Sequence, residues 1–165
     1  MAGIGLDSFV AHSFDKMKTR GLWTYVWATI VNFIRLKPFH ITIKVPGEED
    51  ISEDLFVASI ANTRQYGNNA FIAPDATPND GKIVLVLIKP FPKIISPALI
   101  FRLFTKSLNK SKYVRTLKTE KDITIISDET RFHIDGEPVT ISGEVVVRIK
   151  KDALNVLKTK YLKTK

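Results

Sequence analysis

Hydrophobic residues recur at helical spacing near the start of the chain and at strand spacing through most of the rest. Apolar residues three or four apart predict a helix over 6–17, and a second, more apolar helix over 22–36. Strict alternation then predicts a half-buried strand over 39–45. Two further runs, 54–62 and 82–89, are apolar on both faces, which is typical of strands covered on both sides.

The second half of the sequence predicts one helix among short strands. Ser96 followed by Pro97 is typical of an N-cap and first turn, and predicts a helix that ends near Asn109. Alternating runs predict the remaining strands at 113–119, 122–127, 131–134, 139–141 and 144–150. A short helix is predicted at 152–158. We therefore expect a mainly β, sandwich-like fold with a few flanking helices: an N-terminal helical pair, one mid-chain helix and a short C-terminal helix.

Length and composition favour a single domain over residues 1–165. The chain is 44% hydrophobic and 25% charged, which is typical of a folded globular protein. It contains no cysteine, so neither a disulfide framework nor a thiolate metal site is possible. The most apolar stretch, 22–36, is shorter than the roughly 20 residues of a bilayer span and contains Asn32 and Arg35. With no signal-peptide pattern at the N-terminus, we expect a cytoplasmic protein.

The positive charge points to a polyanionic partner. Lys and Arg number 25 against 17 Asp and Glu, a net charge of +8, which suits an anionic membrane, a nucleic acid or nucleotide phosphates. Six of these cations follow the predicted mid-chain helix: Lys106, Lys110, Lys112, Arg115, Lys118 and Lys121. They form either a solvated face or a surface for anionic headgroups, at about 1 kcal/mol for each basic residue. The strands carry aliphatic side chains rather than aromatics interleaved with cations, which disfavours nucleic acid.

Three glycine-containing segments are candidates for chemistry. AGIGLDS, residues 2–8, resembles part of a dinucleotide fingerprint, but no strand precedes it and Ser8 takes the place of the third glycine. In the loop 62–85, Asp75 and Asp80 are either oxygen ligands for magnesium or calcium or parts of an ordinary turn. Asp135 and Gly136 predict a hairpin turn, and such a turn does not require a glutamate at the neighbouring position 137. His12, His40 and His133 lack ligand spacing and receive no role.

Taken together, AGIGLDSFVA, NTRQYGNNAFIAPDATPNDGKIVLVLI and HIDGEPV resemble the C-terminal domain of the diacylglycerol kinase and sphingosine kinase family, especially its bacterial branch. The resemblance covers nearly the whole chain. Its sharpest motifs are Pro74-x-Ala76-x-x-x-Asp80-Gly81 and the turn Asp-Gly-Glu-Pro at 135–138.

The resemblance implies a β domain that packs against a separate N-terminal α/β domain holding ATP. It further implies that Glu137 is the general base for the lipid hydroxyl and that Asp135 belongs to the same catalytic turn. A rigid hairpin would hold such a base at a fixed geometry toward the cleft, which is what general-base catalysis requires.

The resemblance also implies a magnesium ion held by Asp80 and by the main-chain carbonyls of Thr77 and Lys82. The cleft it implies is bordered by four further residues: Asp7, Gly67, Asn68 and Asn69. The family often has an apolar residue where Pro78 stands and a glycine run where this chain has 67–69. The second difference alters the loop that faces the cleft.

One family element is missing from the sequence: a Gly-Gly-Asp-Gly-Thr phosphate loop occurs nowhere in it. We therefore expect a kinase domain, excised or naturally stand-alone, that is inactive without its ATP-binding partner domain. Its expected partners are that domain, a diacylglycerol-like lipid at the membrane periphery and an anionic membrane surface, with a homo-oligomer also possible. Trp23, Trp27 and Phe33 either line a lipid-tail cavity or belong to the core. The rival hypothesis is a non-catalytic basic β-domain that binds anionic lipid or nucleic acid.

Overall fold

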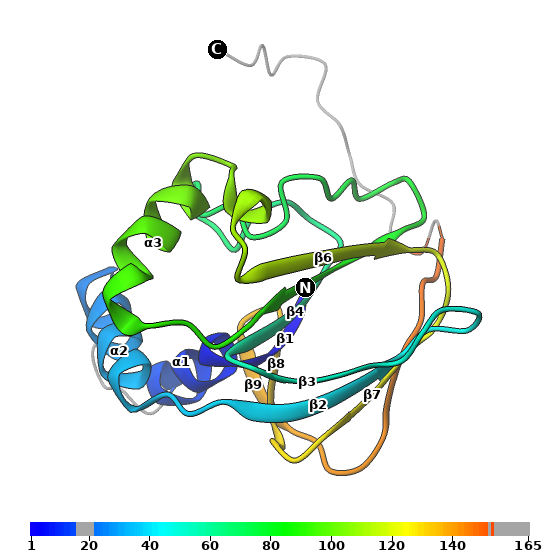
Figure 1. The fold of residues 1–165 in the computed structure, drawn as a ribbon, viewed down its shortest axis with the longest axis horizontal. Helices are drawn as coiled ribbons and strands as arrows, with labels where there is room; N and C mark the ends of the chain where they lie inside the picture. Colours follow the sequence, from blue (N-terminus) through cyan, green and yellow to red (C-terminus); the bar gives the residue numbers. More distant parts are fainter. Residues whose placement is uncertain (16–21, 152, 154–165) are drawn as a thin grey trace.

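Two antiparallel β-sheets lie face to face in the computed structural model, with helices at one side (Figure 1). The structure describes residues 1–15, 22–151 and 153; the side chains of Phe14 and of residues 22–28 are outside this description. One sheet has six strands in the order β6-β5-β4-β1-β8-β9, and the other has four in the order β10-β7-β2-β3. The mainly β, sandwich-like fold expected from the sequence is confirmed.

Most elements lie near the ranges that the sequence predicts, whereas β1 was not predicted. The strands are β1 Ala2–Gly5, β2 Phe39–Lys44, β3 Ile51–Leu55, β4 Val57–Ala61, β5 Ile83–Ile88, β6 Val114–Thr119, β7 Ile123–Ser127, β8 Arg131–Ile134, β9 Glu137–Thr140 and β10 Val145–Val147. The helices are α1 Leu6–Asp15, α2 Leu22–Arg35 and α3 Ser96–Phe104, with short 3-10 turns η1 Lys93–Ile95 and η2 Leu108–Lys110. The predicted helix at 152–158 lies outside the described residues.

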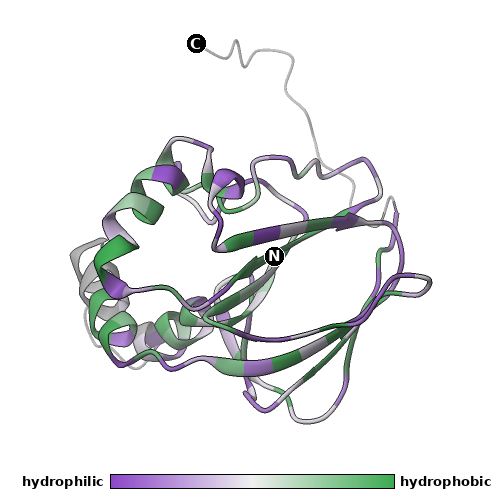
Figure 2. Ribbon diagram, viewed as in Figure 1, coloured by the Kyte–Doolittle hydropathy of each residue, from purple (hydrophilic) through white to green (hydrophobic). Residues whose placement is uncertain are grey.

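The core lies between the two sheets and is built by period-two alternation. Ile41 and Ile43 of β2 point inward and are fully buried, as are Ile123 and Ile125 of β7. In Figure 2 the green, apolar positions alternate with purple ones along β2. Burial of such aliphatic side chains is the main favourable contribution to folding, at about 25 cal/mol for each Å² of apolar surface.

Strand β5 is buried on both faces, which explains its continuous apolar run. Leu85 and Leu87 face the opposite sheet, whereas Val84 and Val86 face outward. The outward pair is covered by a second apolar cluster that includes Leu99 of α3 and residues of the 70–76 loop. The loop and α3 therefore form a third layer over β5.

The predicted strand 54–62 is wrong as a single element. It is divided at Phe56 into β3, which belongs to the four-stranded sheet, and β4, which belongs to the six-stranded sheet. The Phe56 N–H donates to the Ile88 carbonyl (2.8 Å), and its own carbonyl accepts from Leu6 N–H (3.0 Å). Both backbone groups of Phe56 are thus satisfied outside a single ladder, and the chain crosses from one sheet to the other.

The N-cap prediction for the mid-chain helix is also wrong. Ile95 occupies the N-cap position of α3, and Ser96 is the first helical residue. The Ser96 hydroxyl donates back to the Lys93 carbonyl (2.7 Å), so it continues the preceding 3-10 turn instead of capping the helix. The helix ends at Phe104, earlier than the predicted Asn109, and a separate 3-10 turn follows.

We expect Gly5→Ala to destabilise the fold far more than Gly143→Ala. Both glycines have positive φ, 101° and 90°, but a Cβ at Gly5 would lie 2.3 Å from the Phe56 carbonyl oxygen while one at Gly143 would meet nothing within 4 Å. The expected loss in the free energy of unfolding is about 3 kcal/mol or more for Gly5→Ala and about 1 kcal/mol for Gly143→Ala, measured by urea denaturation. Equal losses would contradict the close approach.

Candidate functional site

The residues singled out from the sequence gather along one end of the six-stranded sheet. Strand β5 starts just after Asp80, and its Val84 pairs with Ala61, where β4 ends and the loop 62–69 begins. The pairing then runs from Ile60 to Ala2 and on to Ile134, which pairs with Glu137. One end of the sheet therefore presents the Asp80 loop, the 62–69 loop and the Glu137 turn in a row.

The turn before Glu137 is a tight two-residue hairpin. Asp135 and Gly136 both have positive φ, 50° and 90°, and Ile134 and Glu137 are the pair that closes the hairpin. Positive φ at both turn positions defines a type I′ turn, which matches the twist of the strands it joins. The hairpin turn predicted from Asp-Gly is confirmed. Glu137 is exposed, and among the described residues its carboxylate has no hydrogen bond or ion pair.

Asp135 contacts Met1, the residue that precedes β1. Its N–H donates to the Met1 carbonyl (2.7 Å), and its carboxylate lies 2.6 Å from the amino group of Met1. Within the described part of the chain, Glu137 is thus the acid of this turn whose carboxylate has no hydrogen bond or ion pair.

Helix α1 holds the β8–β9 hairpin through polar contacts along its length. The fully buried Ser8 hydroxyl donates to the Arg131 carbonyl (2.7 Å). One turn later, His12 Nε2 lies 3.2 Å from the carbonyls of both Phe132 and Val139. Because these contacts reach both strands, α1 fixes the hairpin as one unit.

A buried Asp–His contact ties the turn itself to α1. His133 Nδ1 accepts a hydrogen bond from Gly136 N–H (3.3 Å), which assigns the ring proton to Nε2. Nε2 lies 3.2 Å from Asp7 Oδ2, at an angle outside hydrogen-bond geometry, so this contact is electrostatic. Their side chains are only 6% and 11% exposed. A Cβ on Gly3 would lie 2.1 Å from Asp7 Oδ2, so only glycine leaves room for this pair.

Asp7 also reaches the loop 62–69. The Tyr66 hydroxyl donates to Asp7 Oδ2 (3.0 Å). Beside it, Asn68 and Asn69 have left-handed φ values of 46° and 62°, in a turn closed by a bridge between Gly67 and Ala70. Asparagine is among the few residues that adopt this conformation readily, so it can stand where glycine would otherwise be required. The structure thus brings Asp7 and the 67–69 turn together through Tyr66.

The Asp80 loop carries a cation position that Lys118 occupies. Asp80 Oδ1 accepts from Lys82 N–H (3.0 Å), and Asp80 N–H donates to the Thr77 carbonyl (3.3 Å), which forms the predicted turn. The Lys118 ammonium lies 2.7 Å from Asp80 Oδ2 and donates to the Asp75 carbonyl (3.2 Å). The hydrogen bond from Lys118 is the largest influence on the Asp80 pKa and, despite partial desolvation, holds it below its usual value.

The donor set of this loop fits a hard cation. Magnesium prefers carboxylate and carbonyl oxygens, which Asp80 and the carbonyls of Thr77 and Lys82 can supply. Within the described part of the chain no group of three or more His, Cys, Asp or Glu side chains converges on a metal position, so most ligands would be main chain or water. An ion here would also have to displace the Lys118 ammonium. From Asp80 to Glu137 the sheet spans four strand spacings, roughly 15–20 Å, so the two residues do not share one reacting centre.

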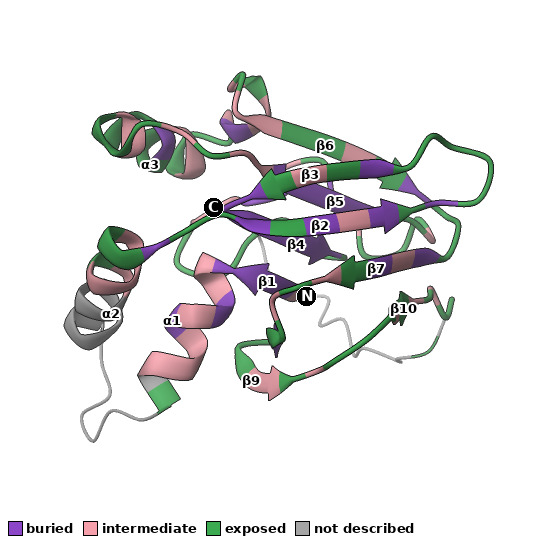
Figure 3. Ribbon diagram, turned by 60° about the horizontal axis from the view of Figure 1, so that its bottom comes forward, coloured by how far each residue is buried: buried purple, intermediate pink, exposed green. Residues whose placement is uncertain are grey.

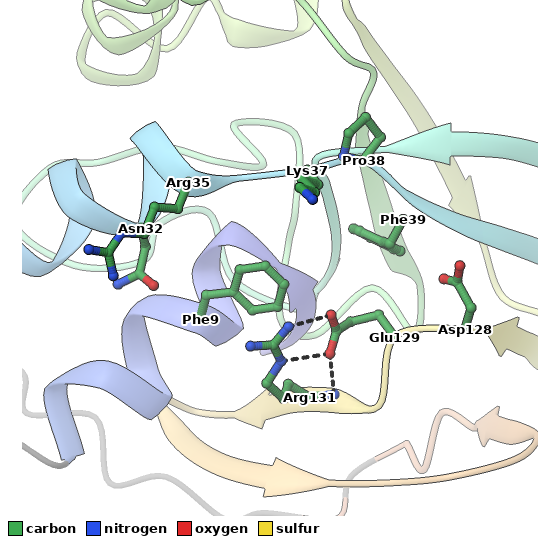
Figure 4. Close-up of a pocket in the computed structure, with 9 residues that line it drawn as sticks. All are labelled: Phe9, Asn32, Arg35, Lys37, Pro38, Phe39, Asp128, Glu129 and Arg131. Atoms are coloured by element: carbon green, nitrogen blue, oxygen red, sulfur yellow. Dashed lines mark hydrogen bonds and ion pairs between the residues drawn. The ribbon is translucent and has the colours of Figure 1, made fainter.

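A separate depression of about 520 Å³ lies at the other end of the hairpin (Figure 4). It is lined by Phe9, Asn32, Arg35, Lys37, Pro38, Phe39, Asp128, Glu129 and Arg131. Arg131 stacks 3.9 Å over the Phe9 ring and forms a two-pronged ion pair with Glu129. Burial raises the Glu129 pKa, but the Arg131 hydrogen bonds outweigh it and hold this pKa below its usual value. None of the predicted site residues lines this depression.

Sequence reasoning missed the residues that hold the site in place. His12 and His133 received no role, yet His12 contacts both strands of the hairpin that carries Glu137, and His133, within that hairpin, accepts a hydrogen bond from its turn. Ser8, noted only for replacing a glycine, is a buried donor to β8. No local pattern in the sequence connects α1 with residues more than a hundred positions later. Phe33 packs against Phe91, with ring centroids 5.9 Å apart, whereas the side chains of Trp23 and Trp27 lie outside the described residues.

Comparison with known proteins agrees with this fold. Residues 1–158 match the family described as "YegS C-terminal NAD kinase beta sandwich-like domain". The chain belongs to this family. The resemblance to the C-terminal domain of the diacylglycerol kinase family, expected from the sequence, is confirmed.

Individual relatives are named as lipid kinases. The chain is 31% identical over 108 residues to the diacylglycerol kinase of Mycobacterium tuberculosis, covering 59% of this chain and 35% of that protein. It is 37% identical over 89 residues to "Probable lipid kinase YegS-like" of Yersinia pestis, covering 54% and 29% respectively. The chain spans about a third of the length of the curated relatives it matches.

A solved structure shares the fold. It is described as a "putative diacylglycerol kinase" from Bacillus anthracis, with a TM-score of 0.58 and 18% identity. The similarity covers 89% of this chain and 48% of that one.

A double-mutant cycle on Asp7→Asn and His133→Asn should reveal strong coupling. Because both side chains are nearly buried, we expect an interaction energy of about 1 kcal/mol or more in the free energy of unfolding, measured by urea denaturation. The matched control is the His40–Asp54 pair, 2.8 Å apart but 55% and 63% exposed. Its coupling should stay below about 0.5 kcal/mol. Strictly additive effects at Asp7 and His133 would show that the two residues do not support each other.

Lys118→Met should increase the affinity of the Asp80 loop for Mg²⁺. The substitution removes the ammonium from Asp80 while keeping an apolar stem of similar length. At a Mg²⁺ concentration a hundred times Kd, binding would add about 2.7 kcal/mol to the stability of the variant. Thermal denaturation with and without Mg²⁺ measures this, and Asp80→Asn added to the variant should abolish the response. A Lys118→Met protein indifferent to Mg²⁺ would count against a cation site here.

Proposed function

We propose that this domain forms the lipid-acceptor side of an ATP-dependent lipid kinase, acting on a diacylglycerol-like hydroxyl, with Glu137 as general base. The observation that carries the proposal is the exposed carboxylate of Glu137, which has no partner among the described residues, at a hairpin turn fixed by α1, Gly3 and His133. The named relatives, which are diacylglycerol and lipid kinases, support the same reaction class.

In the proposed reaction, Glu137 accepts the proton of the lipid hydroxyl as that oxygen attacks the γ-phosphorus of ATP. The new bond joins the lipid oxygen to phosphorus, the bond to the bridging oxygen of ATP breaks, and ADP leaves with that electron pair. A base must lie within about 3 Å of the proton it removes. The type I′ turn and the His133 contact to Gly136 restrain the backbone that carries Glu137 at the sheet end, which limits the entropy lost on reaching that geometry.

The phosphate donor needs a second surface. The depression beside Phe9 and Arg131 does not include Glu137. We infer that a separate ATP-binding domain faces the sheet end and completes the cleft, with Asp7 and the 67–69 turn on the acceptor side. Magnesium bound by Asp80 and the carbonyls of Thr77 and Lys82 would supply positive charge that orders the loop and the surface toward that domain. At four strand spacings from Glu137, it would lie too far to touch the reacting hydroxyl.

Glu137→Gln should abolish most of the turnover in a protein that joins this chain to its ATP-binding domain. The amide keeps the size of the side chain but accepts no proton, so kcat should fall by about 10²–10⁴-fold while KM for the lipid changes little. The measurement is radiolabelled phosphate transfer to diacylglycerol in mixed micelles. The control is Glu144→Gln, an exposed carboxylate between β9 and β10 that this proposal does not use.

The possible results separate the candidate functions. Unchanged turnover in Glu137→Gln would remove Glu137 as the base while leaving a lipid kinase. No turnover in the unsubstituted two-domain protein, with its fold intact, would favour the non-catalytic, lipid-binding or nucleic-acid-binding domain instead.

A further inference from the structure

Helix α3 turns an apolar face to solvent. Three of its outward side chains, Ile100, Phe101 and Phe104, are 54%, 68% and 52% exposed, and Ile94 in the preceding 3-10 turn is 86% exposed. Figure 3 shows α3 with mainly exposed and half-buried positions, and Figure 2 shows the same helix mostly in green. Large apolar side chains that cluster on a surface commonly mark an interaction site.

The inner face of α3 is the face that packs this helix onto the core. Leu99 is 8% exposed and joins the apolar cluster over β5, with Leu103 packed against that cluster. The outward residues recur at the third and fourth positions, so they form a second stripe on the same nine-residue helix. The core therefore does not explain this stripe.

The apolar surface continues onto α2. Ile30 and Ile34 at the end of that helix are 46% and 63% exposed. The Lys93 ammonium donates to the Ile34 carbonyl, which places η1 beside the end of α2. Figures 1 and 3 both show α2 and α3 on the same side of the molecule, off the sheets.

The net charge of the protein resides in the segment that contains α3. Residues 81–119 hold nine Lys or Arg and no Asp or Glu, whereas the rest of the chain holds 16 basic and 17 acidic residues. Within this segment, Lys89 pairs with Glu53 and Lys118 with Asp80. For the other seven, the described part of the chain shows no ion pair with a carboxylate. An apolar stripe flanked in sequence by cations without a carboxylate ion pair fits an anionic lipid surface.

We propose that α3 and η1 lie in the plane of an anionic lipid bilayer, with Ile94, Ile100, Phe101 and Phe104 at the headgroup–acyl boundary. Lys93 and Lys106 stand at the two ends of this stripe, and Lys110 and Lys112 follow it, where they would contact lipid phosphates. No helix within the described residues is long and apolar enough to cross a membrane. This docking is independent of the role of Glu137, because it requires no turnover.

Flotation of the unmodified 165-residue chain with lipid vesicles tests the proposal. We expect binding to vesicles of phosphatidylcholine mixed with phosphatidylglycerol, little binding to phosphatidylcholine alone, and weaker binding as NaCl screens the charges. Phe101→Ser with Phe104→Ser should weaken partitioning by about tenfold or more, because two large apolar side chains leave the interface.

Matched variants separate α3 from general effects. Ile126→Ser with Val146→Ser removes two side chains of the four-stranded sheet that are 40% and 43% exposed, and should leave vesicle binding unchanged. Lys110→Ala with Lys112→Ala should weaken binding to the mixed vesicles, whereas Lys44→Ala, outside the basic segment, should not. Far-ultraviolet circular dichroism and melting temperature verify that each variant is folded.

Three results would overturn the proposal. One is no binding of the unmodified chain to the mixed vesicles. Another is binding that the Phe101 and Phe104 variant retains in full, which would leave charge alone as its cause. The third is self-association in sedimentation velocity that this variant abolishes while vesicles remain unbound, which would assign the α3 face to a second copy of the chain.

Discussion

The contact between Asp7 and His133 is the constraint on which the candidate site depends. It brings the first turn of α1 against the hairpin that carries Glu137, and it exists only because Gly3 has no Cβ in the space between them. A nearly buried carboxylate requires compensation, and here His133, Tyr66 and the Ser8 N–H surround it. The same histidine accepts a hydrogen bond from the turn, so fold stability and the position of the acid rest on one cluster.

Sheet topology extends this local constraint to the whole end of the molecule. Strand β1 lies between β4 and β8, so the residue pairs on either side of it align the 62–69 loop with the hairpin turn. Tyr66 then closes the connection by donating to Asp7. A loop and a turn that are about seventy residues apart in sequence thus share one carboxylate. Any change that shifts the β1 register would move both together.

Local signals predicted much of this structure, and long-range contacts account for what they missed. Alternation located β2, a continuous apolar run located β5, and Asp-Gly predicted the hairpin turn, because these features depend on neighbours in sequence. The break at Phe56 was invisible, since its backbone partners, Leu6 and Ile88, come from distant elements. Likewise, Glu137 was predicted through a family motif, while His133 was passed over because its partner Asp7 lies 126 positions away. Composition gives the net charge, but only the structure shows that exposed apolar side chains on α3 accompany this charge.

The two proposed roles fall on different halves of the six-stranded sheet, so experiments can test them separately. Strands β5 and β6 belong to the basic segment with α3. Strands β8 and β9 carry the turn at Asp135 and Gly136, β1 pairs with β8, and β4 lies between the two groups. Substitutions well apart and without shared partners usually have additive effects. A change on the outer face of α3 should therefore alter vesicle binding without disturbing the Asp7–His133 contact, and a change at Glu137 should leave vesicle binding intact. A protein whose membrane affinity and hairpin stability responded together would instead require coupling through β4, the strand common to both halves.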